Sequence, residues 1–511
     1  MKRNLHIAAA VAAAVAGSGA SFAAAPTVST IAATCNAANA TASCPNTTIN
    51  IMGSSAIKVA LTNSILTNFC GGASNATVIT SNGSNTNFLG IACTPLSSAV
   101  SSANAGLNYN VWLRYEGGSV SGFLPIANAT ATGSPRAAVG YPVSEIDGPS
   151  LTSTGSTCSG SCPITVQGES TANGVDDSFT VTAGGALSYH IPDLGIGDVE
   201  PQALIGSNYP TAYSTTIWGP INPGGVFGLK AAGIMDEVYA VYVNEASSVF
   251  TETPLNLSRQ MLAAILTHQV TNWSQVYDVN LKPVTAAASS LAIRIVNREQ
   301  GSGSRAATDI LLAGDGCGSG GNSSVTIFQP AQANYFSTGD VLKNANTVPG
   351  AVTYATIDNT QQCTSVAGCS TSAQSQTANL TWVTIEGVAP SNLAAAQGTY
   401  PFWVEAQYIN NGANTGADQT AIETIVSGLQ NGATTASIAD VDAIPNIASA
   451  LGGGLKYNGA ITVHLNPASN VVTAGGGGTN LDGSTSTVYV NPYTRGGITC
   501  NNPVVTATQF P

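Results

Sequence analysis

The stretch IVNREQGSGSRAATDILLAG, residues 295–314, joins an apolar run to a helical pattern through a loop of glycine and serine. The run LAIRIV (291–296) has the composition of a buried strand, and the residues after Ser304 favour a helix. Amide N–H groups at the start of a helix have no intrahelical acceptor and can hold an anion. The pattern predicts strand, polar loop and helix, and the loop could bind a nucleotide phosphate, bind a free oxyanion, or be a simple turn.

The loop lacks the residues that complete a nucleotide-binding motif. A G-x-G-x-x-G fingerprint needs a third small residue where the chain has Ala306, which is sometimes tolerated, and a ribose-binding acid about 20 residues later. The sequence there is GCGSGGNSSV (316–325), with no acid, and no Gly-Lys-Ser/Thr of a Walker loop follows the glycines. These absences weigh against a nucleotide and leave a free oxyanion or a plain turn.

Two charged residues bear on that choice. Arg298 ends the apolar run three residues before Gly301, where its planar guanidinium could bind a phosphate with two hydrogen bonds; the alternative is a solvated surface arginine. Asp198 follows the glycine turn in IGDVEP, and alone it would be an ordinary turn or N-cap aspartate. Beside an anion, however, a carboxylate needs a ligand that donates a proton to it. Hydrogen phosphate has such a proton and sulfate has none, so an aspartate acceptor would select phosphate.

The same alternation of strand, Gly/Ser loop and helix recurs along the chain. Strands alternating with helices predict an α/β fold, and ligands of such sheets bind at the carboxyl ends of the strands. A helix is expected to begin near Ser258, a good N-cap residue. The segments that carry the pattern are 48–67, 107–127, 186–204, 235–245 and 255–273.

The beginning of the chain has the layout of a secretory signal peptide. Lys2 and Arg3 precede an Ala/Val-rich run, and small residues lead to an expected cleavage near Ala23 or Ala25. Glycines and a serine at 17–19 interrupt the run before it reaches the roughly 20 residues that span a membrane. We therefore expect export to the periplasm or cell surface, without direct membrane insertion.

Composition and charge restrict the partners. Charged residues make up 8% of the 511 residues, and the net charge is −12. Such an acidic chain has no overall field that attracts nucleic acid, so no nucleic-acid partner is expected. The four histidines are isolated, which argues against a zinc site or a histidine-based triad; no metal, cofactor or catalytic residue is expected.

Ten cysteines in an exported chain favour disulfides over metal binding. Proximity and elimination suggest a set of pairs, although sequence alone leaves the connectivity open. The suggested pairs are Cys35–Cys44, Cys70–Cys93, Cys158–Cys162, Cys317–Cys500 and Cys363–Cys369.

Three stretches resemble motifs of one family. LNLSRQMLAAILTHQVTNW (255–273) resembles the helix motif L-x-L-S-x-x-x-L-A-x-I-F-x-G-x-I-x-N-W, and IVNREQGSGSRAATDIL (295–311) resembles the loop R-x-D-G-S-G-T-T. GVAPSNLAAAQGTYPF (387–402) resembles the later segment V-x-P-S…G-x-Y-P-[LI]. The chain thus resembles the phosphate-binding proteins of bacterial phosphate ABC transporters, in the type II periplasmic binding-protein superfamily. The resemblance covers most of 48–410 apart from insertions.

The resemblance implies a phosphate site, position by position. The family's arginine falls on Arg298, and its proton-accepting aspartate falls on Asp198, where Gly197 replaces the usual preceding serine. Glu299 and Gln300 also depart from the family loop. The implied phosphate-binding residues are Ser55, Ala56, Ser119, Asp198, Arg298, Ser302, Gly303 and Ser304.

The implied fold is a two-lobed type II periplasmic binding protein with hinge strands and β-rich or irregular insertions. We expect a signal peptide at 1–25 and an extended lead-in at 26–44. The expected lobe 1 is 45–233 plus 395–511, with an insertion near 129–184, and the expected lobe 2 is 234–394, with an insertion near 313–378. A further Ser/Thr/Gly-rich insertion is expected near 465–500.

The function that follows is binding of hydrogen phosphate between the lobes and its release unchanged. The protein would be the substrate-binding component of phosphate uptake, and the implied partner is a membrane ABC permease. Two alternatives remain open on sequence grounds. One is a secreted or cell-surface protein for adhesion or assembly on the same fold, and the weaker one is an exported phosphatase.

Overall fold

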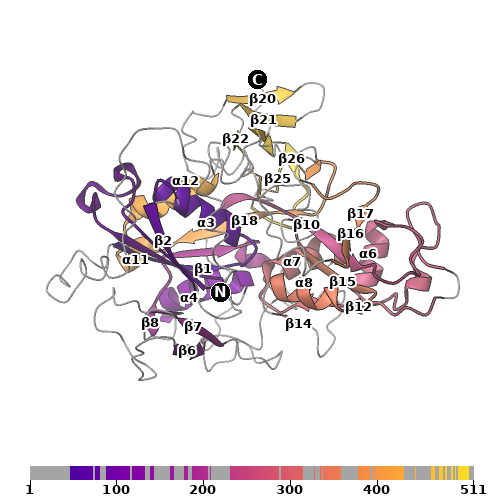
Figure 1. The fold of residues 1–511 in the computed structure, drawn as a ribbon. Coiled ribbons are helices and arrows are strands. Elements are labelled where there is room, and N and C mark those ends of the chain that lie inside the picture. Colours follow the sequence, from indigo (N-terminus) through magenta and orange to yellow (C-terminus); the bar gives the residue numbers. More distant parts are fainter. Residues whose placement is uncertain are drawn as a thin grey trace. The chain divides into compact units, whose positions relative to one another are not determined.

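The computed structural model of the chain forms two compact units (Figure 1). Unit 1 holds the described residues of 1–197, 211–231 and 408–429, and unit 2 holds those of 198–210, 232–407 and 430–511. The predicted signal peptide and lead-in lie outside the described residues. The structure describes residues 47–72, 75–80, 88–115, 118–132, 139–142, 162–165, 178–181, 187–204, 208, 231–286, 289–314, 327, 334–335, 338–357, 378–391, 394–395, 398–430, 443–444, 462–466, 471–475, 478–479, 485–486, 489–490, 493–495 and 497–505.

Unit 1 contains a mixed sheet with the strand order β9-β1-β4-β3-β2. β1 runs parallel to β4 and to β9, whereas β3 runs antiparallel to β2 and to β4. All six residues of β1 are buried, as is typical of a parallel strand covered on both faces. The bounds are β1 Thr48–Gly53, β2 Ala76–Thr80, β3 Phe88–Cys93, β4 Tyr109–Arg114 and β9 Leu194–Gly197.

Helices cover this sheet: Figure 1 shows α3 and α12 on one side of it and α4 on the other. A disulfide between Cys70 and Cys93 ties the end of the η2 turn to β3, and this predicted pair is confirmed. Cys500 is also disulfide-bonded. The other predicted pairings involve residues outside the described part and stay predictions. The helices of unit 1 are α3 Lys58–Ser64 with η2 Ile65–Phe69, η4 Ser97–Ala99, η5 Ser102–Asn104, α4 Gly118–Thr132, α11 Gly412–Thr415 and α12 Gln419–Gln430.

Glycines allow the backbone of α4 to lie directly against β9. A Cβ atom added at Gly195 would lie 1.9 Å from the Gly122 carbonyl oxygen, and one at Gly122 would lie 2.3 Å from the Ile196 oxygen. A Cβ at Gly53, at the end of β1, would lie 2.0 Å from the same Ile196 oxygen. Any side chain at these positions would push backbone from backbone, so the glycines set the spacing of helix and strands in unit 1.

Unit 2 is built on β10, a 13-residue strand rich in aromatic and β-branched residues, in the order β12-β15-β10-β18, with β16 and β19 also paired to β10. β10 is antiparallel to β15, which is parallel to β12. β18 carries the chain from unit 2 into unit 1. The bounds are β10 Ala232–Asn244, β12 Arg294–Ile295, β15 Ala351–Thr356, β16 Leu380–Trp382, β18 Trp403–Asn410 and β19 Ala443–Ile444.

The helices of unit 2 follow from caps and apolar spacing. Ser258 caps α6 by accepting a hydrogen bond from the Met261 amide, so the predicted helix start is confirmed. Leu262, Ile265 and Leu266 form its buried face at helical spacing. The helices are α6 Arg259–Leu266, η8 Pro201–Ala203, η10 Trp273–Gln275, α7 Gly303–Thr308 with η11 Asp309–Ala313, and α8 Thr338–Asn346.

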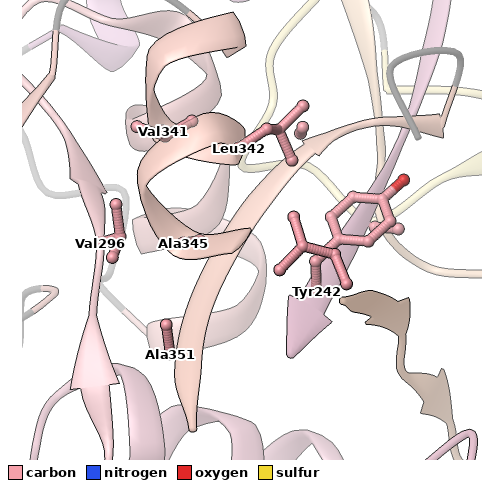
Figure 2. Close-up of a cluster of buried hydrophobic side chains, with 9 residues drawn as sticks. Tyr242, Val296, Val341, Leu342, Ala345 and Ala351 are labelled. Atoms are coloured by element: carbon pink, nitrogen blue, oxygen red, sulfur yellow. The ribbon is translucent and has the colours of Figure 1, made fainter. Parts of the chain in front are cut away.

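Figure 2 shows the core that fixes the segment before the glycine loop. Val296 packs in one cluster with Val341 and Leu342 of α8 and with Tyr242 of β10. The range 313–378, expected as an insertion, thus contributes α8 and β15 to this core.

Short strands complete the described structure: β5 Val139–Pro142, β6 Cys162–Thr165, β7 Ser178–Val181, β8 Leu187–His190, β11 Asn256–Leu257, β13 Asn297–Arg298, β14 Asn334–Tyr335, β17 Thr384–Ile385, β20 Thr462–Asn466, β21 Val471–Gly475, β22 Gly478–Thr479, β23 Thr485–Ser486, β24 Tyr489–Val490, β25 Tyr493–Thr494 and β26 Val504–Val505.

The predicted α/β class is confirmed, whereas two predicted strands are wrong in detail. The run 291–296 forms only the two-residue β12, and β13 follows after Val296. The segment 186–204 forms β8 and β9 with Pro192 between them, and the helix expected after Asp198 is the three-residue η8. Proline has no N–H to donate to a ladder, which accounts for the break.

The C-terminal segment, residues 493–501, packs on buried acids of unit 2. The amides of Arg495 and Gly497 donate to the Glu405 carboxylate at 3.1 and 2.6 Å. The Arg495 guanidinium lies 4.7 Å from the Trp403 ring centre. The amide and hydroxyl of Thr499 donate to the Glu200 carboxylate at 2.9 and 2.6 Å. Glu200 is two residues beyond Asp198, so the C-terminal segment supports the loop that bears Asp198.

Candidate functional site

Arg298 is at the end of β13 and is almost fully buried, with 1% of its surface exposed. Its Nη1 donates to the Thr338 hydroxyl at 2.9 Å and to the Ser304 hydroxyl at 3.5 Å. Its backbone amide donates to the Tyr354 hydroxyl at 3.3 Å, and that hydroxyl donates to the Asn297 side chain. The alternative of a solvated surface arginine is therefore wrong, because the Thr338 and Ser304 side chains hold this guanidinium inside unit 2.

The glycine loop brings three predicted residues next to Arg298. Gly301 has a φ of 89°, which favours glycine, and its amide donates to the Asn208 oxygen at 2.8 Å. Ser302 is the N-cap of α7 and accepts the Arg305 amide at 3.4 Å. Gly303 and Ser304 form the first turn, and all three predicted loop residues are buried.

Asp198 is brought to the same place from the end of β9. Its Oδ2 accepts a hydrogen bond from the Ser304 hydroxyl at 3.2 Å, and the side chain is buried. The carboxylate, the hydroxyl and the Arg298 guanidinium therefore form one polar cluster within unit 2. A charge-assisted donor and a carboxylate acceptor in a buried place are strong and selective groups for an anion that carries a proton.

Four further residues adjoin this cluster and were not predicted from the sequence. Tyr239 and Glu237 lie two residues apart on β10, a spacing that places both on one face and was an available signal. Thr338 had no local signal. Arg305 is fully buried, and its Nη1 donates to the Arg298 carbonyl at 3.3 Å. Asp309 follows Arg305 by four residues, and this helical spacing was the available sequence signal for the 4.0 Å ion pair that the two side chains form.

Tyr239 connects the cluster to Glu237. The Tyr239 hydroxyl donates to Glu237 Oε2 at 3.0 Å and lies 3.5 Å from the Ser304 hydroxyl, for whose single proton it is the longer alternative acceptor to Asp198. Burial, followed by the nearby charges of Asp198 and Glu237, raises the pKa of Tyr239 well above its usual value of 10.0. Tyr239 is therefore neutral, and its hydroxyl keeps its proton.

The predicted residues of unit 1 lie on two turns of that unit. Ser55 and Ala56 follow β1, and the Ala56 amide, assigned to the ligand by the resemblance, donates to the Ser54 hydroxyl at 3.2 Å. The Ser54 amide donates to the Ile196 oxygen at 3.1 Å. Ser119 is buried in the first turn of α4.

The packing around Ser119 explains one departure from the family motif. A Cβ atom added at Gly197 would lie 2.6 Å from the Phe123 ring and 3.0 Å from the Ser119 Cβ. The serine that usually precedes the aspartate would therefore collide with α4 in this chain. Gly197 is the residue that lets Ser119 and β9 lie together in unit 1.

Within the described part of the chain, no group of three or more His, Cys, Asp or Glu residues is arranged to hold a metal ion. No helix among the described residues is both long and apolar enough to cross a membrane.

Residues 228–430 match a family model described as a PBP superfamily domain. No curated protein matches the chain. Among solved structures, a phosphate ABC transporter substrate-binding protein with bound phosphate from Clostridium perfringens is 13% identical, with a TM-score of 0.32, and the alignment covers 50% of this chain and 79% of the other. An ABC-type phosphate transport receptor from Vibrio cholerae is 20% identical, with a TM-score of 0.28, over 47% of this chain and 74% of the other.

Proposed function

We propose that this chain, in which residues 228–430 form a PBP superfamily domain, binds hydrogen phosphate reversibly. In this proposal it is the exported substrate-binding component of phosphate uptake. It works in the periplasm or at the cell surface and delivers its ligand to a membrane ABC permease. The ligand is released unchanged, so the protein is a binder and not an enzyme.

The observation that supports the proposal is the cluster of Asp198, Arg298 and Ser304 in unit 2. Arg298 supplies the positive charge that a phosphate needs inside a protein of net charge −12. Asp198, whose Oδ2 accepts a hydrogen bond from Ser304, supplies a carboxylate that accepts the proton of hydrogen phosphate. Sulfate would place a bare oxyanion against the same buried carboxylate, which costs free energy because the two negative charges repel without a hydrogen bond.

The proposed ligand set is the one implied by the family motifs. From unit 2 it includes Ser302 and Gly303 in addition to the cluster. From unit 1 it includes the turn residues Ser55 and Ala56 and the helix residue Ser119. Neutral hydroxyl and amide donors suit the oxygens of phosphate that carry no proton.

Calorimetry with phosphate, sulfate and arsenate tests the proposal on the wild type and on Asp198→Asn. The wild type is expected to bind phosphate and to discriminate against sulfate. Because the asparagine amide donates where the carboxylate accepted, Asp198→Asn should lower phosphate affinity by about tenfold or more and raise sulfate affinity. Asp340→Asn, at the first turn of α8, is the matched control for loss of one carboxylate in unit 2.

Three results would overturn parts of the proposal. Absence of phosphate binding at micromolar protein would remove the function itself. Equal competition by sulfate in the wild type would remove the role given to Asp198. Release of phosphate from an ester, lost in Ser55→Ala, would instead identify the protein as a phosphatase.

A further inference from the structure

The Glu200 carboxylate, two residues beyond Asp198, is held by one residue of the C-terminal segment. The Thr499 amide donates to Glu200 Oε1 at 2.9 Å, and the Thr499 hydroxyl donates to Oε2 at 2.6 Å. Both residues are buried, with 4% of Glu200 and 2% of Thr499 exposed. Hydrogen bonds to a carboxylate are strong in such surroundings, so Thr499 fixes Glu200 at both of its oxygens.

Thr499 is itself fixed, because Arg495 binds the turn that carries it. Arg495 Nη1 donates to the Asn501 carbonyl at 2.7 Å and to the Thr499 carbonyl at 3.5 Å, and Nη2 donates to the Pro401 carbonyl at 3.1 Å. The Arg495 amide donates to the buried Glu405 carboxylate at 3.1 Å. Pro401 and Glu405 belong to unit 2. The donors of Thr499 are therefore anchored in the unit that contains the polar cluster.

Fixing Glu200 restricts the place of Asp198. Gly197 belongs to unit 1 and Asp198 to unit 2, so the position of Asp198 within unit 2 depends on the residues that follow it. Two residues of chain span at most about 7 Å. Glu200 has the extended backbone, φ −62° and ψ 152°, that a residue before proline favours, and Pro201 follows it. Val199, between the two acids, is fully buried. The stretch from Asp198 to Glu200 is therefore short and stiff.

Binding of phosphate gives up one of the contacts that hold Asp198. The Ser304 hydroxyl has a single proton, which it donates to Asp198 Oδ2 at 3.2 Å. In the proposed ligand set the same hydroxyl donates to phosphate instead. The Asp198 carboxylate must nevertheless stay where it accepts the proton of the ligand. The bonds between Thr499 and Glu200 use no group of the proposed ligand set, so they hold the segment with or without phosphate.

We propose that Thr499 is a positioning residue of the phosphate site, which acts through Glu200 to keep Asp198 against the ligand. The inference rests on the proposed function and deepens it, because it extends the control of anion selectivity to the C-terminal segment. When Asp198 is displaced, hydrogen phosphate loses the acceptor of its proton, whereas sulfate loses a repelling charge. Loss of the anchor therefore lowers phosphate affinity without lowering sulfate affinity. A residue that only stabilised the fold would lower both.

Thr499→Val tests the inference, because it removes the hydroxyl and keeps the amide and the branched shape. Phosphate affinity should fall about fivefold in calorimetry, the effect of about one hydrogen bond. Sulfate affinity, measured by competition with phosphate, should stay within about twofold or rise. Thr499→Ser keeps the hydroxyl and should bind phosphate within about twofold of the wild type.

Thr384→Val is the matched control. It makes the same substitution in unit 2 and removes a hydroxyl that donates to the Leu255 carbonyl at 3.1 Å. The ratio of phosphate affinity to sulfate affinity should remain that of the wild type. An equal fall of this ratio in Thr384→Val and Thr499→Val would contradict a specific role of Thr499.

Glu200→Met tests the route by which Thr499 acts. It keeps the length of the side chain and removes the acceptor of both Thr499 bonds, so the affinity ratio should fall at least as far as in Thr499→Val. Adding Thr499→Val to Glu200→Met should then change the ratio by less than about twofold, because a residue that acts only through Glu200 has nothing further to lose. A second, independent fivefold fall in the double variant would overturn the inference.

The outcomes distinguish this inference from the function on which it rests. If the wild type does not bind phosphate, or binds sulfate equally well, the proposed function or its selectivity fails and the inference fails with it. If the wild type selects phosphate and Thr499→Val keeps the wild-type ratio, only the inference fails. Equal falls in phosphate and sulfate affinity also overturn it, because they show a structural role alone. Thermal unfolding establishes that each variant is folded, and the pair Thr499→Val and Thr384→Val decides the matter if Glu200→Met is not.

Discussion

The turn of unit 1 that bears Ser55 and the loop of unit 2 that bears Ser304 follow strands in the same way but are held by different means. In unit 1, backbone holds backbone: the Ser54 amide bonds to the Ile196 oxygen, and glycines let helix and strands touch. In unit 2, buried side chains hold one another, with Arg298, Ser304 and Asp198 in one cluster. The difference teaches that changes to the backbone contacts of the first region should act on folding, whereas changes to the buried side chains of the second should act on ligand affinity.

The largest expected effect is on unit 1 and comes from Gly195→Ala. The added Cβ atom would lie 1.9 Å from the Gly122 carbonyl oxygen, so helix and strand must separate. The free energy of unfolding should fall by about 3 kcal/mol or more, measured by urea denaturation.

Gly428→Ala is the matched control within unit 1. Its new Cβ atom would first meet the Ser64 hydroxyl at 2.4 Å and the Asn68 amide at 2.6 Å, which are side-chain atoms that can move. Its cost should be less than half that of Gly195→Ala. Equal costs for the two variants would show that backbone contact is not what holds unit 1.

Arg298→Ala is the corresponding test of unit 2. It removes the buried guanidinium that bonds to Thr338 and Ser304, and phosphate affinity should fall about 100-fold, or about 3 kcal/mol, in calorimetry. Arg294→Ala, four residues earlier and exposed, should change affinity less than about twofold. A loss below about threefold in Arg298→Ala would contradict the charge-based account of this region.

Asp193 is a charged group in unit 1, and it should affect stability through pH. Its carboxylate accepts the Asn50 amide at 2.7 Å and also the Thr415 hydroxyl. Burial raises its pKa from 3.8 to about 6, so between these values the folded state binds more protons than the unfolded state. Stability from this group is complete below pH 4 and is lost as the pH rises through about 6.

The measurement is urea unfolding of the wild type and Asp193→Asn at several pH values. The wild-type advantage over the variant should shrink by about 2 to 3 kcal/mol between about pH 4 and pH 7, because each tenfold difference in proton affinity between the folded and unfolded states corresponds to about 1.4 kcal/mol. Parallel stability curves for the two proteins would show that Asp193 does not titrate in this way.

The smallest effect is expected from Ser55→Ala in unit 1. One neutral hydrogen bond to phosphate would be lost, which corresponds to about a fivefold fall in affinity with little change in stability. Ser97→Ala, at an exposed serine of η4, is the control and should bind phosphate as the wild type does. A loss as large as that of Arg298→Ala would erase the distinction between the two regions.

Much of the fold could be predicted because local signals agreed with it. Ser258 and the apolar spacing after it gave α6, and the aromatic and β-branched run at 235–245 gave β10. The family motifs at 255–273 and 295–311 lie inside residues 228–430, the range that matches the PBP superfamily domain, as the resemblance to that superfamily predicts. The eight assigned ligand residues and the lobe boundaries stay predictions.

The rest of the cluster depends on contacts between distant residues, which local patterns do not encode. Thr338 reaches Arg298 across 40 residues, and Ser304 reaches Asp198 across 106. Alternation along β10 places Glu237 and Tyr239 on one face, but which face meets Ser304 depends on the packing of the whole unit. The burial of Arg305 could not be predicted for the same reason, because it follows from contacts with Arg298 and Asp309.

The bond between Thr499 and Glu200 spans 299 residues and has a consequence for the order in which the molecule is completed. During synthesis, Glu200 and the neighbouring Asp198 are made long before the segment that supports them. A chain cut short before Arg495 would contain all eight assigned ligand residues, yet its buried acids Glu200 and Glu405 would lack these donors. Arg495, Gly497 and Thr499 therefore give the buried acids Glu405 and Glu200 their donors only after all eight assigned ligand residues have been synthesised.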